Sequence, residues 1–231
     1  MKPISRRHFL QLCTAAGTTL IIPATIFSDD SGKTLSERYL QTISAVTAAY
    51  RHEMEAHFSY VEFSRRAATE KFPNVGYLFT ALSTSELVHS KLFKSTLSEL
   101  GVDVKNEQDI SPKVGNTGDN LVRAAEHELL LLEKFYPDAI EKIKSEEHAT
   151  ALTYCEYAWE SHQQHREHID KIKKWEFFSN LVAKFIEKEE TQYFVCTGCG
   201  STVNEIPQND CPICEKTSHQ YTLVDRDAYL K

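Results

Sequence analysis

The chain has 231 residues, of which 41% are hydrophobic and 26% are charged, a composition that excludes disordered and collagen-like proteins. Its net charge is −7, which argues against nucleic acid as a partner because phosphate binding needs a basic surface. With only 8 Gly and 7 Pro, the sequence favours helices over many turn-linked strands.

Residues 1–28 have the pattern of an export signal, with a basic start, an apolar middle and no acidic residue. The run from Ser5 to Leu10, SRRHFL, resembles the twin-arginine motif. An ordinary secretory signal, or an anchor that is never cleaved, is the alternative. We therefore expect export to the periplasm, with attachment to a membrane only if the signal is uncleaved.

Four long helices are predicted from apolar residues that recur every three or four positions. They cover residues 35–72, 74–100, 119 to a kink or restart at Pro137, and about 147–173, with a short helical piece near 176–190. Residues 101–118 are rich in Gly, Asn, Asp, Ser and Pro and form one long connection in the middle. This order is typical of a ferritin-like four-helix bundle, which we place at residues 33–190.

The predicted helices carry metal-ligating side chains in a repeated pattern. One ligand on a helix is followed by a pair on the next helix, three residues apart and so on one face: Glu53 with Glu86 and His89, then Glu128 with His162 and His165. Carboxylates can bridge two irons and offset their charge, while an imidazole fills a terminal position. The pattern predicts a di-metal site inside the bundle. The alternative is that these side chains lie on solvated helix faces.

The last forty residues change character and carry four of the six cysteines. Cys196 and Cys199 form one Cys-x-x-Cys pair, and Cys211 and Cys214 form a second. Two closely spaced pairs predict a tetrahedral thiolate cage for one iron or zinc, rather than a disulfide framework. We place this small metal domain at residues 191–231. A zinc knuckle that only holds the segment together is the alternative.

The two halves together resemble rubrerythrin, a ferritin-like di-iron bundle followed by a rubredoxin-like domain, over about residues 35–231. The resemblance rests on the stretches Glu53 to Phe63 and Ala124 to Pro137, and on Cys-x-x-Cys-Gly followed by Cys-Pro-x-Cys. It implies two non-haem irons on the family's ligand positions, Glu53, Glu86, His89, Glu128 and His165, and one iron on the four cysteines. Tyr60 and Tyr136 match tyrosines that line the family's di-iron site.

The sequence departs from the family pattern at two positions. The family's third helix has a second Glu three residues after the first, and this chain has Leu131 there. The fourth helix of the family offers Glu-x-x-His, and this chain has His162 in place of that Glu. The resemblance therefore implies that an iron movement onto the missing Glu is lost, and that His162 fills a carboxylate position without bridging.

The resemblance implies a peroxidase-type oxidoreductase that reduces hydrogen peroxide to water. Electrons would come from an unidentified donor in an NAD(P)H-linked chain and pass through the tetrathiolate iron, with Tyr60 or Tyr136 steadying the peroxide. Head-to-tail homodimers would bring one chain's cysteine domain to another chain's bundle. An enzyme that oxidises Fe²⁺ or reduces O₂, and an electron-transfer or metal-binding protein without turnover, are the other two hypotheses.

Overall fold

The computed structural model describes residues 34–104, 111–174 and 178–230. The predicted export signal lies outside these residues. Within the described part, no helix is long and apolar enough to cross a membrane. Residues from Ser36 onward form one compact unit, which contains both the helices and the cysteine-rich segment.

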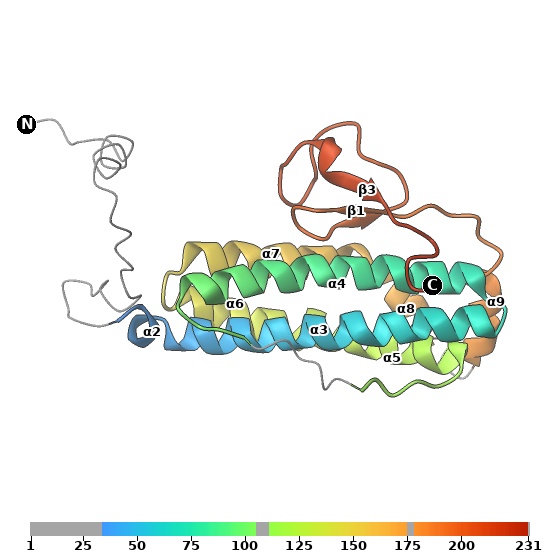
Figure 1. Cartoon of the computed structure of the whole chain (residues 1–231), viewed down its shortest axis with the longest axis horizontal. Helices are drawn as coiled ribbons and strands as arrows, with labels where there is room; N and C mark the ends of the chain where they lie inside the picture. The colour runs from blue at the N-terminus through green and yellow to red at the C-terminus, as the bar shows by residue number, and fades with distance from the viewer. Residues whose placement is uncertain (1–33, 105–110, 175–177, 231) are drawn as a thin grey trace, which may run out of the picture. The chain divides into compact units, whose positions relative to one another are not determined.

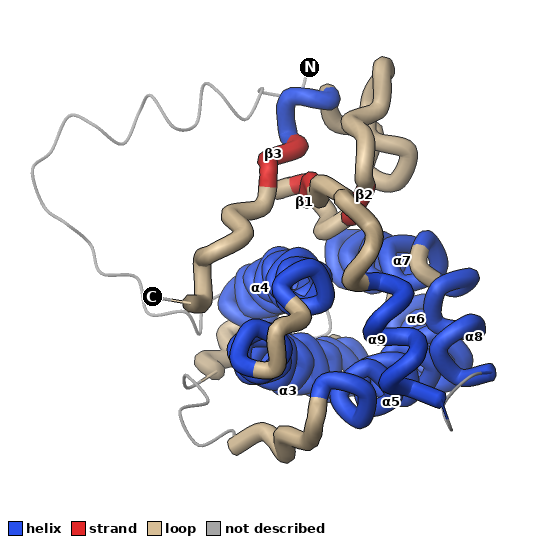
Figure 2. The backbone as a smooth tube through the Cα atoms, turned by 90° about the vertical axis from the view of Figure 1, so that its right-hand side faces the viewer, coloured by secondary structure: helices blue, strands red, loops and turns tan. Residues whose placement is uncertain are grey.

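Two long antiparallel helices form one side of the bundle (Figure 1 and Figure 2). After the short α2 (Leu35–Arg38) come α3 (Leu40–Thr69) and α4 (Pro73–Glu99), which run side by side in Figure 1. Lys71 has a positive φ of 63° in the turn between them, and Pro73 occupies the first turn of α4, where its missing N–H costs nothing. The first predicted helix, residues 35–72, is thus two helices that are separated at Tyr39, and it ends at Thr69, three residues before the predicted end.

The third predicted helix is interrupted rather than simply kinked. It consists of α5 (Thr117–Leu130), a π-helical turn (Leu131–Phe135) and α6 (Tyr136–Lys144). The helix restarts at Tyr136, directly before Pro137, whose ring cannot continue the preceding hydrogen-bond ladder. Single π turns inside helices often occur at functional sites, and this one begins three residues after Glu128.

The fourth predicted helix is two helices. α7 (Ala149–Gln164) ends at His165, whose N–H bonds back to the carbonyl of His162, and α8 (Arg166–Lys174) continues from there. α9 (Ser179–Ile186) follows, and Figure 2 shows α8 and α9 beside the end of α5. The break at His165 changes which way this side chain points.

Three helices are capped at their N-termini by glutamates from distant parts of the chain. Glu146 accepts from the first N–H groups of α3 at 3.0 and 2.8 Å, and Glu187 from those of α4 at 2.8 and 3.3 Å. Glu70 accepts from the N–H and hydroxyl of Thr117 at 2.8 and 2.6 Å, at the start of α5. Each carboxylate satisfies free N–H groups and lies at the positive end of a helix dipole.

Two apolar clusters fill the bundle on either side of a polar centre. Along α3, one cluster includes Ala45 to Tyr50 and the other Ala56 to Ala67, with Glu53 between them. Along α4 the order is reversed, because the helices are antiparallel: Phe79 belongs to the second cluster and Phe93 to the first. The polar centre is thus enclosed by apolar packing at both ends.

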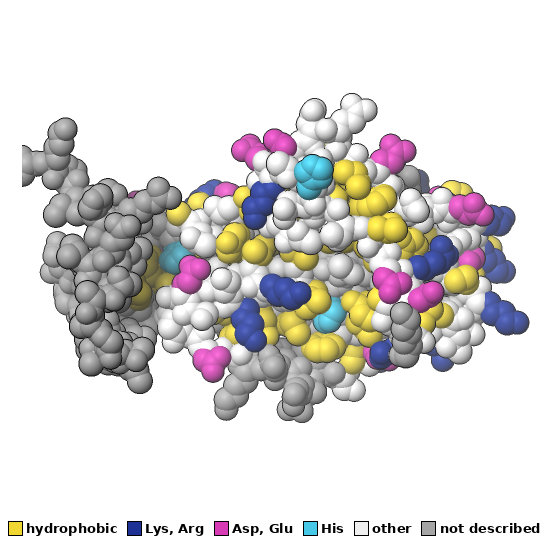
Figure 3. Space-filling view, turned by 45° about the horizontal axis from the view of Figure 1, so that its top comes forward, with side chains coloured by type: hydrophobic (Ala, Val, Ile, Leu, Met, Phe, Trp, Pro, Cys, Tyr) yellow, Lys and Arg dark blue, Asp and Glu magenta, His cyan; other side chains and the backbone are white. Residues whose placement is uncertain are grey.

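The cysteine-rich tail, which the structure describes over residues 191–230, forms a small antiparallel sheet that packs on the bundle. Its strands are β1 (Phe194–Cys196), β2 (Thr202–Val203) and β3 (Tyr221–Leu223), in the order β2-β1-β3, with Cys196 opposite Tyr221. Tyr77 of α4 binds the tail twice, donating to the carbonyl of Val224 and accepting from the N–H of Tyr193, both at 3.2 Å. On the face shown in Figure 3, acidic and basic side chains are interspersed among hydrophobic ones.

Candidate metal centres

Buried carboxylates and imidazoles from four helices meet at the polar centre of the bundle. Glu53 of α3, Glu86 and His89 of α4, and His162 of α7 have ligand atoms that all lie within 4.8 Å of one another. Glu128 of α5 joins them, with Oε2 2.5 Å from Nδ1 of His162. We call these five residues the bundle site, and each is at least 97% buried.

The three-residue spacing on α4 places Glu86 and His89 on the same face of the helix. Nδ1 of His89 lies 3.0 Å from Oε2 of Glu86 and 3.5 Å from Oε2 of Glu53. His162 joins the opposite side, with Nε2 3.5 Å from Oε1 of Glu53. From the sequence, His162 was expected to occupy the position of a carboxylate ligand. The structure places its imidazole between the carboxylates of Glu53 and Glu128.

Two tyrosines close the site. The hydroxyl of Tyr60 donates to Oε1 of Glu128 at 2.7 Å, and that of Tyr136 donates to Oε1 of Glu53. Both tyrosines are fully buried, and burial beside carboxylates raises the pKa of each phenol well above its ordinary value. Both therefore stay protonated and act as hydrogen-bond donors.

The bundle site has the donors that metal ions require. Oε2 of Glu53 and Nε2 of His162 are buried without a hydrogen-bond partner in the described structure. Leaving such groups unpaired in an apolar interior costs several kcal/mol. Three carboxylates and two imidazoles are a ligand set that iron accepts. The residues present therefore fit two metal ions.

The pKa values of the bundle-site residues indicate which of them hold a proton when no metal ion is bound. Burial opposes ionisation of Glu53, but the neighbouring Glu86, His162 and His89 side chains hold its pKa well below its ordinary value. Burial and the charge of Glu53 raise the pKa of Glu86 well above its ordinary value. Burial works against the imidazolium of His162, yet the charges of Glu128 and Glu86 raise its pKa. The ligands thus hold protons that metal binding displaces.

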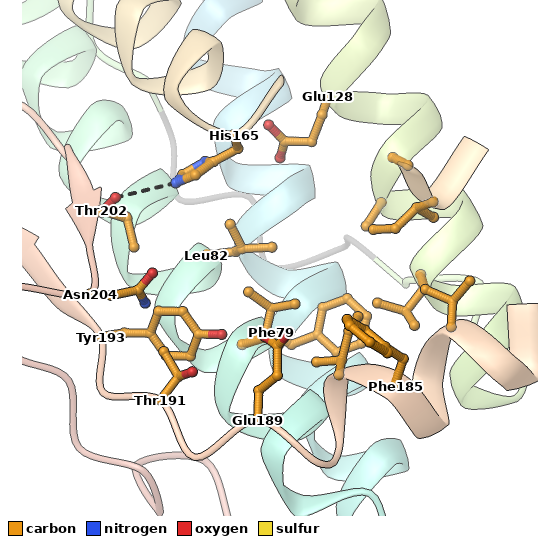
Figure 4. A pocket seen from close by; sticks show the side chains of 17 residues that line it. Phe79, Leu82, Glu128, His165, Phe185, Glu189, Thr191, Tyr193, Thr202 and Asn204 are labelled. Atoms are coloured by element: carbon orange, nitrogen blue, oxygen red, sulfur yellow. Dashed lines mark hydrogen bonds between the residues drawn. The ribbon is translucent and has the colours of Figure 1, made fainter. Parts of the chain in front are cut away.

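The structure does not bring His165 into the bundle site. The spacing of three residues puts His162 and His165 on one face only while the helix continues, and α7 ends at Gln164. The half-buried His165 side chain turns toward the tail, with Nε2 3.4 Å from the carbonyl oxygen of Thr202 (Figure 4). Leu131 is fully buried in an apolar cluster that also contains Tyr136.

The second centre is the thiolate cage of the tail. Sγ atoms of Cys196 and Cys214 are 3.7 Å apart, and those of Cys199 and Cys211 are 3.6 Å apart. A tetrahedral metal with about 2.3 Å bonds to sulfur requires sulfurs about 3.8 Å apart. The neighbouring Cys199 thiol lowers the pKa of Cys196 to about 5, so a thiolate forms readily. The four thiols are free, as metal binding requires.

A direct contact joins the two centres, and sequence reasoning missed it. Nε2 of His89 lies 3.0 Å from the carbonyl oxygen of Cys199, and the hydroxyl of Ser85 donates to the carbonyl of Gly200 at 2.7 Å. Because a carbonyl only accepts, Nε2 of His89 carries the proton and Nδ1 keeps its lone pair for a metal ion. No spacing in the sequence signals a contact between segments more than one hundred residues apart.

Gly200 makes this approach possible. It has a φ of +82°, and a Cβ atom built there would lie 2.2 Å from Nε2 of His89. Any side chain there would displace either the imidazole of His89 or the tail. The Gly that follows the second cysteine therefore serves both the turn around the cage and the contact with the bundle site.

The fold and these two centres define a ferritin-like di-iron protein with a tetrathiolate metal domain. The sequence model of the Rubrerythrin family matches residues 45–173, more than half of the chain, so the chain belongs to the rubrerythrin family. It holds a di-iron site and a tetrathiolate metal site, as expected, and is an oxidoreductase-type protein. The expected fold, mainly helical with a rubredoxin-like domain, is confirmed.

Individual relatives extend the likeness beyond the family match. Rubrerythrin-2 of Clostridium acetobutylicum is 27% identical over 183 residues, which are 78% of this chain and 95% of the relative. Nigerythrin of Nitratidesulfovibrio vulgaris is 22% identical over 181 residues, 78% of this chain and 85% of the relative. The fully reduced, all-ferrous structure of nigerythrin superposes with a TM-score of 0.67 at 20% identity, over 87% of this chain and 91% of that one. The structural likeness spans bundle and tail.

Proposed function

We propose that this protein reduces hydrogen peroxide to water at the bundle site, with electrons relayed through the tetrathiolate iron. The observation that carries the proposal is the hydrogen bond from His89 to the carbonyl of Cys199, which joins the two centres within one chain. The reaction takes one peroxide, two protons and two electrons, breaks the O–O bond and yields two waters. Transfer of those electrons is the chemistry that bound iron supplies.

The chain's own residues organise the site for this reaction. Glu53, Glu86, Glu128, His89 and His162 are the proposed ligands; His165, expected as a ligand, faces the tail instead. Tyr60 and Tyr136 each hold one carboxylate by a hydrogen bond and, because they stay protonated, can donate to a bound peroxide. The ligand side chains are almost fully buried, which limits the bulk water around the reacting atoms.

The electron path needs no second copy of the chain. The resemblance suggested that a head-to-tail dimer would bring a tail to a bundle, whereas here His89 and Cys199 belong to the same chain. A homodimer remains a prediction, and the proposed relay does not depend on it. We also propose export by the twin-arginine route, with an NAD(P)H-linked donor chain supplying the electrons.

Single-turnover kinetics test the proposal. The iron-loaded chain is reduced without oxygen and mixed with hydrogen peroxide, and the absorbance of the oxidised tetrathiolate iron is followed. We expect reoxidation at least tenfold faster than in Glu86→Gln, which keeps the side-chain shape but removes a buried carboxylate. Equal rates in the two proteins would contradict a relay through the bundle site.

One observation favours a second candidate, an electron carrier that binds metal without turnover. Leu131 leaves the bundle site with three carboxylates, and apolar packing fills the place of a fourth. Fewer negative charges offset less of the charge on two irons. Full iron occupancy without any response to peroxide would support this candidate over the enzyme.

A further inference from the structure

A cavity of about 210 Å³ lies between the bundle and the tail, next to the bundle site. Its walls come from α4, α5, α8, α9 and the tail. Most of the lining is apolar, including Phe79, Leu82, Leu121, Ile172, Val182 and Phe185. The reduction of hydrogen peroxide alone gives no reason for an apolar cavity of this kind.

Two polar side chains of the cavity, Glu128 and His165, lie at its inner end. Figure 4 shows Glu128 and His165 together at one end, and Phe185 and Glu189 at the opposite end. Glu128 is also part of the bundle site, where it binds Tyr60 and His162. A molecule in the cavity therefore places its inner end against the bundle site. Phe185 is 67% exposed, so the outer end reaches the surface.

The size and chemistry of the cavity select a class of ligand. An apolar cavity of about 150 Å³ holds a benzene molecule, whereas one water occupies only about 30 Å³. The cavity at the bundle site is thus large enough for an aromatic ring with a short branch. Burial of such a group among apolar side chains is favourable, and the polar end fixes its orientation.

We propose that this cavity binds apolar organic hydroperoxides and presents their hydroperoxyl group to Glu128 and His165. The inference rests on the proposed function, whose substrate it broadens. The O–O bond of ROOH breaks with two electrons from the metal centres and two protons from solvent, and the products are the alcohol ROH and one water. The carbon chain remains among Phe79, Leu121 and Val182.

Glu128 has the capacity to recognise this group. Its Oε1 accepts from Tyr60 and its Oε2 contacts His162, so each oxygen retains a second lone pair, and ligation of a metal by one oxygen leaves the other able to accept. The O–H of a hydroperoxide is a donor that such an oxygen accepts. Hydrogen peroxide presents the same O–H but leaves the apolar part of the cavity unfilled.

The test compares cumene hydroperoxide with hydrogen peroxide on the iron-loaded, full chain. Val182→Phe adds a ring inside the cavity, and the matched control Leu181→Phe adds one on the same helix at a side chain that is 60% exposed and does not line the cavity. We expect Val182→Phe to lower the ratio of kcat/KM for cumene hydroperoxide to that for hydrogen peroxide at least tenfold. Leu181→Phe should leave both values within twofold.

The outcomes separate this inference from the proposed function. Turnover of hydrogen peroxide without turnover of cumene hydroperoxide, or an unchanged ratio in Val182→Phe, would overturn the inference and leave the proposed function standing. If neither peroxide reacts, the proposed function fails, and binding of the inert product 2-phenyl-2-propanol is measured by calorimetry instead. Binding to the native chain that Val182→Phe weakens tenfold would support the cavity as an aryl-alkyl site, and no binding would overturn it.

Discussion

Replacing Gly200 by alanine tests whether the contact between the two metal centres is built by this glycine. A Cβ atom there would lie 2.2 Å from Nε2 of His89, so either the imidazole of His89 or the tail must shift, and both movements break the contact of His89 with the tail. The left-handed backbone, with φ of +82°, adds a strain of about 1–2 kcal/mol for any residue with a Cβ atom. The variant therefore suffers two penalties that need to be separated.

Gly101 provides the matched control. Its φ is +76°, and a Cβ atom built there has nothing within 4 Å. Gly101→Ala should thus cost the backbone strain alone, about 1–2 kcal/mol. Gly200→Ala should cost about 0.5–3 kcal/mol more, because it also breaks the hydrogen bond of His89 to the tail, and that of Ser85 where the tail moves, each worth about 0.5–1.5 kcal/mol.

Urea unfolding of the two metal-loaded variants measures these free energies, and peroxide-driven reoxidation of the tetrathiolate iron measures the relay. The visible spectrum of that iron shows whether the cage itself is intact in Gly200→Ala. We expect reoxidation to slow at least tenfold in this variant and to stay unchanged in Gly101→Ala. Equal loss of stability, together with equal rates, would refute the role assigned to Gly200 and to the contact of His89.

Three further predictions concern the fold. Glu146→Gln should lower the free energy of unfolding by about 0.5–2 kcal/mol relative to the exposed control Glu141→Gln, measured by urea titration. Burial opposes ionisation of Glu146, but hydrogen bonds from two backbone N–H groups lower its pKa. The difference in unfolding free energy should therefore be complete above about pH 4.5 and should shrink as acid protonates the carboxylate. A difference that stays constant down to about pH 3 would contradict this prediction. Tyr60→Phe should cost about 1–3 kcal/mol in the metal-free protein by leaving Glu128 underpaired, and an unchanged Tm would disprove it. Chelation of the tail's metal should expose Tyr221 to solvent, seen by near-ultraviolet circular dichroism, because the cage holds its packing; an unchanged spectrum would speak against this.

Sequence spacing predicted those parts of the structure that depend on local geometry. The pair Glu86 and His89 meets because three residues of α4 return a side chain to the same face. The four cysteines meet because two short Cys-x-x-Cys turns can supply a tetrahedral cage. In both cases the two ligands of a pair come together when a single turn of the backbone has the expected conformation.

The sequence did not reveal features that depend on where an element stops or on what packs against it. The spacing of His162 and His165 assumes a continuous helix, and the end of α7 at Gln164 separates them. The caps by Glu146, Glu187 and Glu70 join segments far apart in the chain, and a surface glutamate carries no local sign of such a partner. Tertiary contacts decide these features.

The two departures from the family pattern are consistent with each other once the packing is considered. Leu131 begins the π turn and is enclosed by apolar side chains. A carboxylate at this position would be buried, and no positively charged group of the described site would lie next to it. His162 instead reaches Glu128 with one ring nitrogen and faces Glu53 with the other. His162 thereby links a carboxylate of α3 to a carboxylate of α5. In the absence of metal, an acidic side chain at this position would repel both carboxylates. In the metal-free protein the imidazole thus lies between two buried acids, and its second nitrogen remains directed at the place where a metal ion binds.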